Sequence, residues 1–146
     1  MNEPQPILSL VTLGVTDLAK STRFYEALGF VRKAKDNDGV AFFQAGVCTL
    51  ALFPSAELAK DATITSPDKP GNFRGVSLAW NCTSEADVDA AFKRAKAVGA
   101  TIVKPPEKVF WGGYSGYFAD PDKHLWEVAH NPLFPLDDAG RLTLPD

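Results

Sequence analysis

Hydrophobic positions follow one pattern twice, about 70 residues apart along the chain. In the first copy, Leu8 to Val15 is rich in apolar residues and predicts a strand. Thr16-Asp17 then supplies a helix N-cap signal, and the helix is expected to end at Gly29. At about 100° per residue, its core-facing stripe consists of Leu18, Ser21, Phe24, Tyr25 and Leu28.

The second copy begins with a predicted strand from Gly75 to Cys82, followed by a helix start at Thr83-Ser84-Glu85. Gly99 closes this helix as Gly29 closes the first. Its stripe consists of Val88, Ala91, Phe92, Ala95 and Val98. Strand, cap, stripe and terminal glycine all match, which indicates an internal duplication.

Short strand-like runs follow each helix, separated by turn residues such as Gly46, Gly112-Gly113 and Asp120-Pro121-Asp122. The runs are Phe30 to Lys35, Val40 to Ala45 and Val47 to Phe53, then Thr101 to Lys104, Tyr114 to Ala119 and Leu125 to His130. Each half is therefore predicted to be strand–helix–strand–strand–strand, an α+β arrangement.

We expect one domain over residues 1–146. Module one covers about 7–53, a linker 54–72 has a short helix at Ala56 to Lys60, module two covers about 73–131, and a tail runs from 132 to 146.

The composition is that of an ordinary globular protein, with 45% hydrophobic and 23% charged residues. The net charge is −3 and the 15 basic residues are scattered among 18 acidic ones, which argues against nucleic acid or an anionic membrane as partner. No apolar run approaches the roughly 20 residues that span a bilayer, and Met1 to Pro6 lacks signal-peptide features. Cys48 and Cys82 are expected to be reduced thiols in a cytoplasmic protein, with a disulfide as the alternative.

Three motifs carry a family resemblance: Val15-Thr16-Asp17-Leu18-Ala19-Lys20-Ser21, Phe24-Tyr25-Glu26-Ala27-Leu28-Gly29-Phe30 and Asp120-Pro121-Asp122-Lys123-His124-Leu125-Trp126-Glu127. With the duplication, the chain resembles the vicinal oxygen chelate superfamily, which includes glyoxalase I, bleomycin-resistance proteins and extradiol dioxygenases. The resemblance implies two βαβββ modules forming a curved, cup-like eight-stranded mixed sheet with the helices outside. It also implies a small-molecule ligand in the cup, usually together with a divalent metal, and a homodimer. The superfamily usually has glycine at the position of Lys123; if φ is positive there, a lysine costs on the order of 1 kcal/mol.

Metal-dependent members of that superfamily supply ligands from the first and last strands of each module. The resemblance places these positions at Leu10, Ala51, Ser77 and Glu127, of which Glu127 alone retains a carboxylate. Alternation puts His130 on the opposite strand face, so it does not join Glu127 unless the strand is bulged. We therefore expect no conventional metal site and no cofactor, with a divalent metal as the alternative.

The sequence also offers candidate residues for catalysis and for ligand binding. Glu127 is a candidate base or hydrogen-bond acceptor. The stretch from Val109 to Tyr117 interleaves aromatic residues with glycines, and this predicts a rim in which Trp111, Tyr114 and Tyr117 stack on a ligand. Gln44 and Arg74 are candidates to orient a polar ligand group. A hairpin with ordinary core aromatics is the alternative for the rim.

Three functions remain open. The first is a protein that binds a small, largely apolar or aromatic molecule, with Leu10 and Ala51 as an apolar floor. The second is a glyoxalase-related metal-dependent lyase, isomerase or dioxygenase that uses Glu127, and the third is an interaction module whose sheet serves as a dimer surface. The apolar tail from Pro132 to Leu136 is expected to cover another surface.

Overall fold

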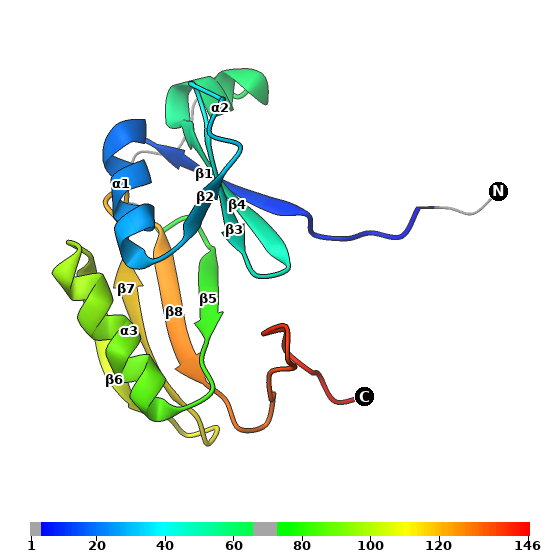
Figure 1. Ribbon diagram of the computed structural model, residues 1–146, viewed down its shortest axis with the longest axis vertical. Helices are drawn as coiled ribbons and strands as arrows, with labels where there is room; N and C mark the ends of the chain where they lie inside the picture. Colours follow the sequence, from blue (N-terminus) through cyan, green and yellow to red (C-terminus); the bar gives the residue numbers. More distant parts are fainter. Residues whose placement is uncertain (1–3, 66–72) are drawn as a thin grey trace.

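The computed structural model describes residues 4–65 and 73–146, and these form two βαβββ modules (Figure 1). The first module consists of β1 (Leu10–Val15), α1 (Leu18–Leu28), β2 (Val31–Lys33), β3 (Ala41–Ala45) and β4 (Cys48–Pro54). The second consists of β5 (Ser77–Asn81), α3 (Glu85–Ala97), β6 (Thr101–Lys108), β7 (Tyr114–Ala119) and β8 (Leu125–His130). The predicted tandem repeat of one unit is confirmed.

Between the modules lies the short helix α2 (Ser55–Asp61), which confirms the helix expected at Ala56 to Lys60. Part of the expected linker, residues 66–72, lies outside the described residues.

The two modules have the same sheet topology. Their strand orders are β1-β4-β3-β2 and β5-β8-β7-β6, with the first strand of each module parallel to the last and the other neighbours antiparallel. The eight strands thus form two four-stranded mixed sheets within the described residues. Their closure into the single cup-like sheet that the resemblance implies is not seen in the hydrogen bonding of these strands.

Both long helices begin and end where the sequence indicates. The Asp17 carboxylate accepts a hydrogen bond from the Lys20 backbone N–H, and the Ser84 hydroxyl accepts one from the Asp87 N–H. Beyond α1, Gly29 has a φ of 118°, a left-handed conformation that only glycine adopts at low cost.

Several strand ends differ from the sequence prediction, by one to four residues, and those of β1 and β6 have a visible cause. β1 begins at Leu10 rather than Leu8, since the preceding residues run out of the sheet as an extended, exposed segment (Figure 1). β6 continues past Lys104 to Lys108 through two prolines. It tolerates them because it is an edge strand whose pairing with β7 shifts register on both sides of Lys104.

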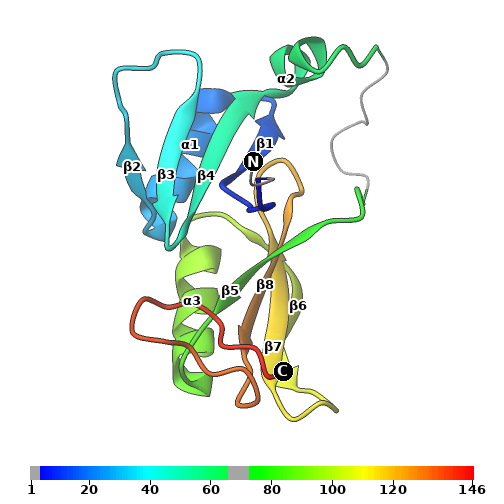
Figure 2. The ribbon, with the colours of Figure 1, turned by 90° about the vertical axis from the view of Figure 1, so that its right-hand side faces the viewer.

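Each long helix covers one face of its own sheet, α1 on β4 and α3 on β6, β7 and β8 (Figure 2). The predicted stripes supply all the buried residues of these helices except Thr22, and one hydrophobic core runs through both modules. In β8, alternation directs Trp126 and Val128 into this core, while Glu127 lies on the opposite face.

A buried polar network joins the modules. The Tyr25 hydroxyl on α1 donates to Asp120 Oδ2 at 2.6 Å and accepts from Trp126 Nε1 at 3.0 Å. The backbone N–H groups of Asp122 and His124 donate to Asp120 Oδ1 at 2.9 and 2.8 Å. Burial raises the pKa of Asp120, and the hydrogen bond from Tyr25 opposes that rise. Burial, together with the charge of Asp120, raises the pKa of Tyr25 well above its ordinary value.

The second aspartate of the same turn also reaches the first module. Asp122 Oδ1 accepts hydrogen bonds from the Thr16 backbone N–H and hydroxyl at 2.9 and 2.8 Å, and Asp122 Oδ2 accepts one from the Ser21 hydroxyl at 3.2 Å. Lys123 has a φ of 69°, so this position does adopt the left-handed conformation for which glycine is favoured. The turn between β7 and β8 is therefore the joint between the two modules.

Candidate ligand-binding cleft

A cleft of about 720 Å³ lies where the two modules meet. One wall is the end of the first sheet and of α1, and includes Val11, Leu28 and Leu50. The facing wall is β5, from Leu78 to Asn81, with Trp126 behind it. This volume falls within the range of roughly 300–1,000 Å³ that is typical of small-molecule sites.

Aromatic and aliphatic side chains dominate the lining of the cleft. Trp80 and Phe30 contribute half-buried rings, and the buried Trp126 lies behind Phe30, with the two ring centroids 5.6 Å apart. Polar groups are few and come from Thr49, Gln44, Asn81, Lys33 and Arg94. A planar apolar molecule fits these walls, with polar contacts at the edge.

The C-terminal tail closes one side of the cleft. Leu136 and Leu142 pair across a short hairpin, and Asp137 holds its turn by accepting hydrogen bonds from the backbone N–H groups of Ala139 and Arg141. These hydrogen bonds lower the pKa of the Asp137 carboxyl, and the bond from the Arg141 backbone N–H has the largest effect. Ala139 and Gly140 at the tip line the cleft. The tip of the tail thus forms part of one side of the cleft, whereas the apolar run from Pro132 to Leu136 does not line it and Leu133 remains exposed.

Glu127 lies on the open face of the second sheet, one strand away from the cleft. Its register partner on the edge strand β5 is Ala79, which lines the cleft. On the other side, the Tyr117 hydroxyl donates to Glu127 Oε2 at 3.1 Å. Burial and the charge of Glu127 raise the pKa of Tyr117. The carboxylate therefore has a hydrogen-bonded phenol as its partner.

The four positions that the resemblance assigns to metal ligands lie two on each sheet. Leu10 is 43% exposed on β1, and Ala51 is 1% exposed on β4, in register with Thr12 and Phe42. Ser77 is exposed on β5, and Glu127 is the one strong donor of the four.

A divalent metal does not fit this donor set. Leu10 and Ala51 carry no donor atom, and within residues 4–65 and 73–146 no group of three His, Cys, Asp or Glu side chains is placed to hold an ion.

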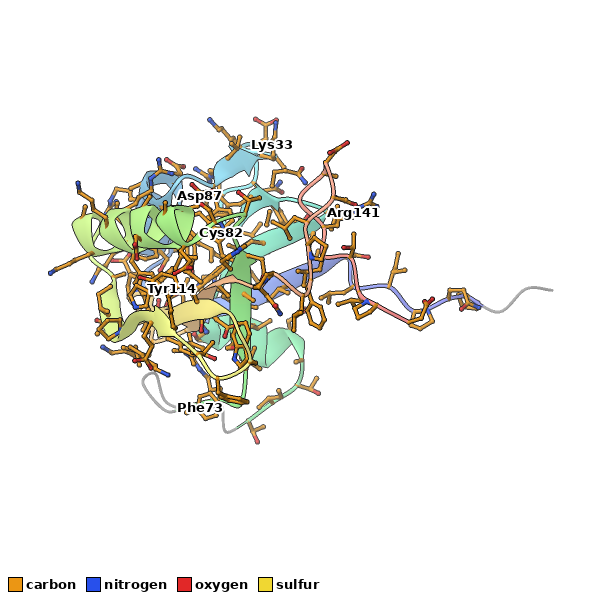
Figure 3. The ribbon with its side chains drawn as sticks, turned by 90° about the horizontal axis from the view of Figure 1, so that it is seen from below. Lys33, Phe73, Cys82, Asp87, Tyr114 and Arg141 are labelled. Carbon is orange, nitrogen blue, oxygen red and sulfur yellow. The ribbon has the colours of Figure 1, made fainter. Side chains whose placement is uncertain are left out.

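The aromatic residues of the segment from Val109 to Tyr117 do not gather at one place. Phe110 is fully exposed, and the Trp111 ring lies against Gly113, where a Cβ atom would overlap it. Tyr114 lies beneath α3 and donates to Asp89 at 2.6 Å (Figure 3). Tyr117 points to the opposite sheet face, toward Glu127. Of the three predicted rim residues, the structure brings only Tyr117 next to another candidate.

Gln44 and Arg74 have different surroundings. Gln44 lines the cleft, and its amide donates to the carbonyl of Gly46 at 2.6 Å. Arg74 Nη2 donates to the carbonyl of Asp122 at 2.8 Å and so supports the turn that joins the modules. Gln44 is thus the one predicted ligand-binding residue that lines the cleft among the described residues.

Both cysteines are free and half-buried. Burial, aided by the charge of Asp87, raises the pKa of the Cys82 thiol to about 11, and this disfavours a thiolate at neutral pH. Within the described residues, no helix is long and apolar enough to cross a membrane.

Sequence reasoning missed the cleft itself and the two cations at its edge, Lys33 and Arg94. Lys33 and Arg94 come to the same cleft only through the packing of the two modules, and no local sequence pattern predicts that packing. It also treated Asp120 and Asp122 as ordinary turn residues. One signal pointed to them: the stripe of the first helix carries Ser21 and Tyr25 where the second carries alanines, and buried hydroxyls need partners.

The two βαβββ modules are the arrangement that the vicinal oxygen chelate resemblance implies, and comparison with known families points to the same class of protein. The sequence profile of the Glyoxalase/Bleomycin resistance protein/Dioxygenase superfamily matches residues 7–128. The chain belongs to this superfamily, the vicinal oxygen chelate group that its motifs resemble.

Particular relatives are similar over most of the chain. A glyoxalase-related enzyme from Fulvimarina pelagi has a crystal structure with a TM-score of 0.86 and 32% identity, covering 97% of this chain and 100% of that one. A glyoxalase/bleomycin resistance protein/dioxygenase from Nocardioides has a TM-score of 0.73 and 25% identity, covering 88% and 85%. An uncharacterized protein of Mycolicibacterium smegmatis is 35% identical over 100 residues, covering 68% of this chain and 72% of its own.

Proposed function

We propose that this protein binds a small, largely apolar or aromatic molecule in the cleft between its modules, without a conventional metal site. The observation that carries the proposal is the 720 Å³ cleft with two tryptophans in its lining. Burying a planar apolar ligand there removes apolar surface from water on both partners, at roughly 25 cal/mol per Å². Leu10 and Ala51 support the metal-free part, because neither side chain has an atom that binds a cation.

A neutral fluorescent probe, N-phenyl-1-naphthylamine, tests the apolar cleft. We expect its emission to rise on binding the wild-type protein and its affinity to fall at least tenfold in Ala79→Trp, which fills space on the β5 wall. Ala97→Trp is the matched control, since Ala97 is exposed on α3 and does not line the cleft. Equal binding by both variants would place the probe elsewhere and refute the site.

Titration with Ni²⁺, Zn²⁺, Mn²⁺ and Fe²⁺ tests the absence of a metal site. We expect no stoichiometric binding below micromolar concentration, because Glu127 is a single strong donor. Sub-micromolar binding of one ion per chain that is lost in Glu127→Gln would overturn the metal-free proposal.

The hydrogen bond of 3.1 Å between Tyr117 and Glu127 favours a second candidate, a glyoxalase-related lyase or isomerase. There Glu127 acts as a general base on the open sheet face, and Tyr117 orients it. Glu127→Gln is expected to abolish turnover of a substrate while leaving the urea midpoint unchanged. Glu107→Gln, at an exposed glutamate paired with Lys104, is the control that keeps activity. Full activity in Glu127→Gln excludes this candidate.

We also propose that two copies pair as a homodimer. Large apolar side chains are exposed on several described segments, among them Ile7, Leu8, Phe73, Val76 and Phe110. Light scattering on the purified protein is expected to give twice the mass of one chain, and a mass of one chain at micromolar concentration would contradict the pairing.

A further inference from the structure

The cleft carries positive charge in a chain that is acidic overall. Lys33 and Arg94 are the charged side chains among the described cleft-lining residues, and no aspartate or glutamate of that part of the chain accompanies them. The whole chain has 18 acidic and 15 basic residues, so an acid-free lining is not what the average composition would give.

Neither cation is neutralised by a neighbour. Within the described chain, no carboxylate oxygen lies within 4.0 Å of Lys33 Nζ or of the Arg94 guanidinium. Two nearby arginines differ in this respect: Arg32 pairs with Glu26 at 3.9 Å, and Arg141 pairs with Asp137 at 2.9 Å. Lysines elsewhere on the described surface, such as Lys93 and Lys96, also lack an ion-pair partner, so what distinguishes Lys33 and Arg94 is that they line the cleft.

Arg94 is held in place at this edge. Its Nη1 donates to the carbonyl of Leu28 at 3.4 Å, and it passes over Gly29 so closely that a Cβ atom there would lie 2.7 Å from Nη1. A guanidinium has five N–H donors, so this contact leaves donors for a ligand. Lys33 enters from β2, at the side of the molecule where the C-terminal hairpin with Arg141 also lies (Figure 3).

From these contacts we infer that the ligand of the cleft is a small aromatic or aliphatic carboxylic acid. Its apolar body lies against Trp80 and Phe30, and its carboxylate binds Arg94 and Lys33 at the edge. Arginine suits this role because its planar donors match a carboxylate, and an ionised hydrogen-bond pair is about twice as strong as a neutral one. The inference rests on the cleft being the binding site, as proposed above.

A matched pair of probes separates charge from apolar fit: 1-naphthaleneacetic acid, which is ionised at pH 7, and its neutral amide. Calorimetric titration is expected to show the acid binding wild-type protein at least tenfold more tightly than the amide. Arg94→Gln and Lys33→Gln are each expected to reduce this preference to threefold or less while leaving the affinity for the amide unchanged. Arg94→Lys, which keeps the charge, is expected to retain part of the preference.

Lys96→Gln is the control for net charge, since Lys96 is exposed on α3 and does not line the cleft. The urea midpoint of Arg94→Gln checks that loss of the contact to Leu28 has not unfolded α1. Equal affinity for acid and amide in the wild type would overturn the inference and leave the apolar cleft standing. Loss of the preference in Lys96→Gln to the same extent would also overturn it. Failure of both probes to bind, together with failure of the neutral naphthylamine, would refute the proposed cleft function itself.

Discussion

Replacing Tyr25 by phenylalanine tests whether the buried network holds the two modules together. The side chain is fully buried, and its hydroxyl serves two partners: it donates to Asp120 and accepts from Trp126. The substitution keeps the ring and its packing but removes both bonds. The Asp120 carboxylate then remains buried without the hydrogen bond from Tyr25, and the Trp126 indole N–H remains buried without its acceptor.

The cost follows from the two bonds. A hydrogen bond to a charged group contributes about 1.5–3 kcal/mol, and a buried donor left without a partner costs about 1–3 kcal/mol. Allowing for partial relaxation, Tyr25→Phe should lower the free energy of unfolding by about 2–4 kcal/mol. For a chain of this length, that corresponds to a fall in Tm of roughly 5–15 °C.

Urea denaturation followed by circular dichroism measures this loss. Tyr114→Phe is the matched control, because its hydroxyl also donates to an aspartate at 2.6 Å, but at the surface. We expect the control to change the free energy of unfolding by less than about 0.5 kcal/mol. An equal loss in the two variants would show that burial of the network does not matter and would refute the reasoning.

The loss should also depend on pH. The pKa of Asp120 is raised above its ordinary value of 3.8 by burial, so the stability it contributes is fully present below pH 3.8 and is lost as the pH rises through the folded-state pKa. Tyr25 opposes that rise, so Tyr25→Phe should raise this pKa further. The destabilisation by Tyr25→Phe should therefore be larger at pH 7 than at pH 4. The same value at both pH values would contradict the assignment.

Three further outcomes are expected. Gly29→Ala should destabilise the protein by about 1–2 kcal/mol because of its positive φ, whereas Gly39→Ala, at an ordinary φ in open space, should be neutral; thermal unfolding distinguishes them. Cys82 should react slowly with iodoacetamide at pH 8 and much faster as the pH approaches its pKa of about 11, as mass spectrometry of the labelled peptide would show; fast labelling at pH 8 would disagree with its burial. Glu127→Gln should lower the pKa of Tyr117 toward 10.0, because the carboxylate charge contributes to its rise, and absorbance titration of the phenols would detect the shift; an unchanged titration curve would mean that burial alone raises it.

The parts of the fold that sequence predicted are those set by local chemistry. Caps at Asp17 and Ser84, and the glycine that ends α1, follow from the needs of a helix terminus, and the strands follow from alternation. β8 confirms this, because the predicted separation of Glu127 from Trp126 by strand face is what the structure shows.

The candidate site could be predicted only in part. Glu127 and Tyr117 were identified separately, and their hydrogen bond follows once β7 and β8 pair in register. The cleft needs the contact between α1, β5 and the tail, which are far apart in the sequence. Arg94 reaches the cleft edge through its contacts with Leu28 and Gly29 of the other module, which its position on a helix surface does not predict.

The two modules contribute different groups to the joint between them: the second supplies the carboxylates and the first supplies the hydroxyl donors. Asp120 and Asp122 of the second half find hydroxyls on α1, where Tyr25 and Ser21 stand. The corresponding positions of α3 are alanines, which are buried and offer no donor side chain. If the second module took the place of the first, Asp120 and Asp122 would face alanines in place of Tyr25 and Ser21. Both carboxylates would then be buried without these hydroxyl donors, at a cost of several kcal/mol. The duplicated halves have thus become complementary parts with a fixed order, and neither can replace the other.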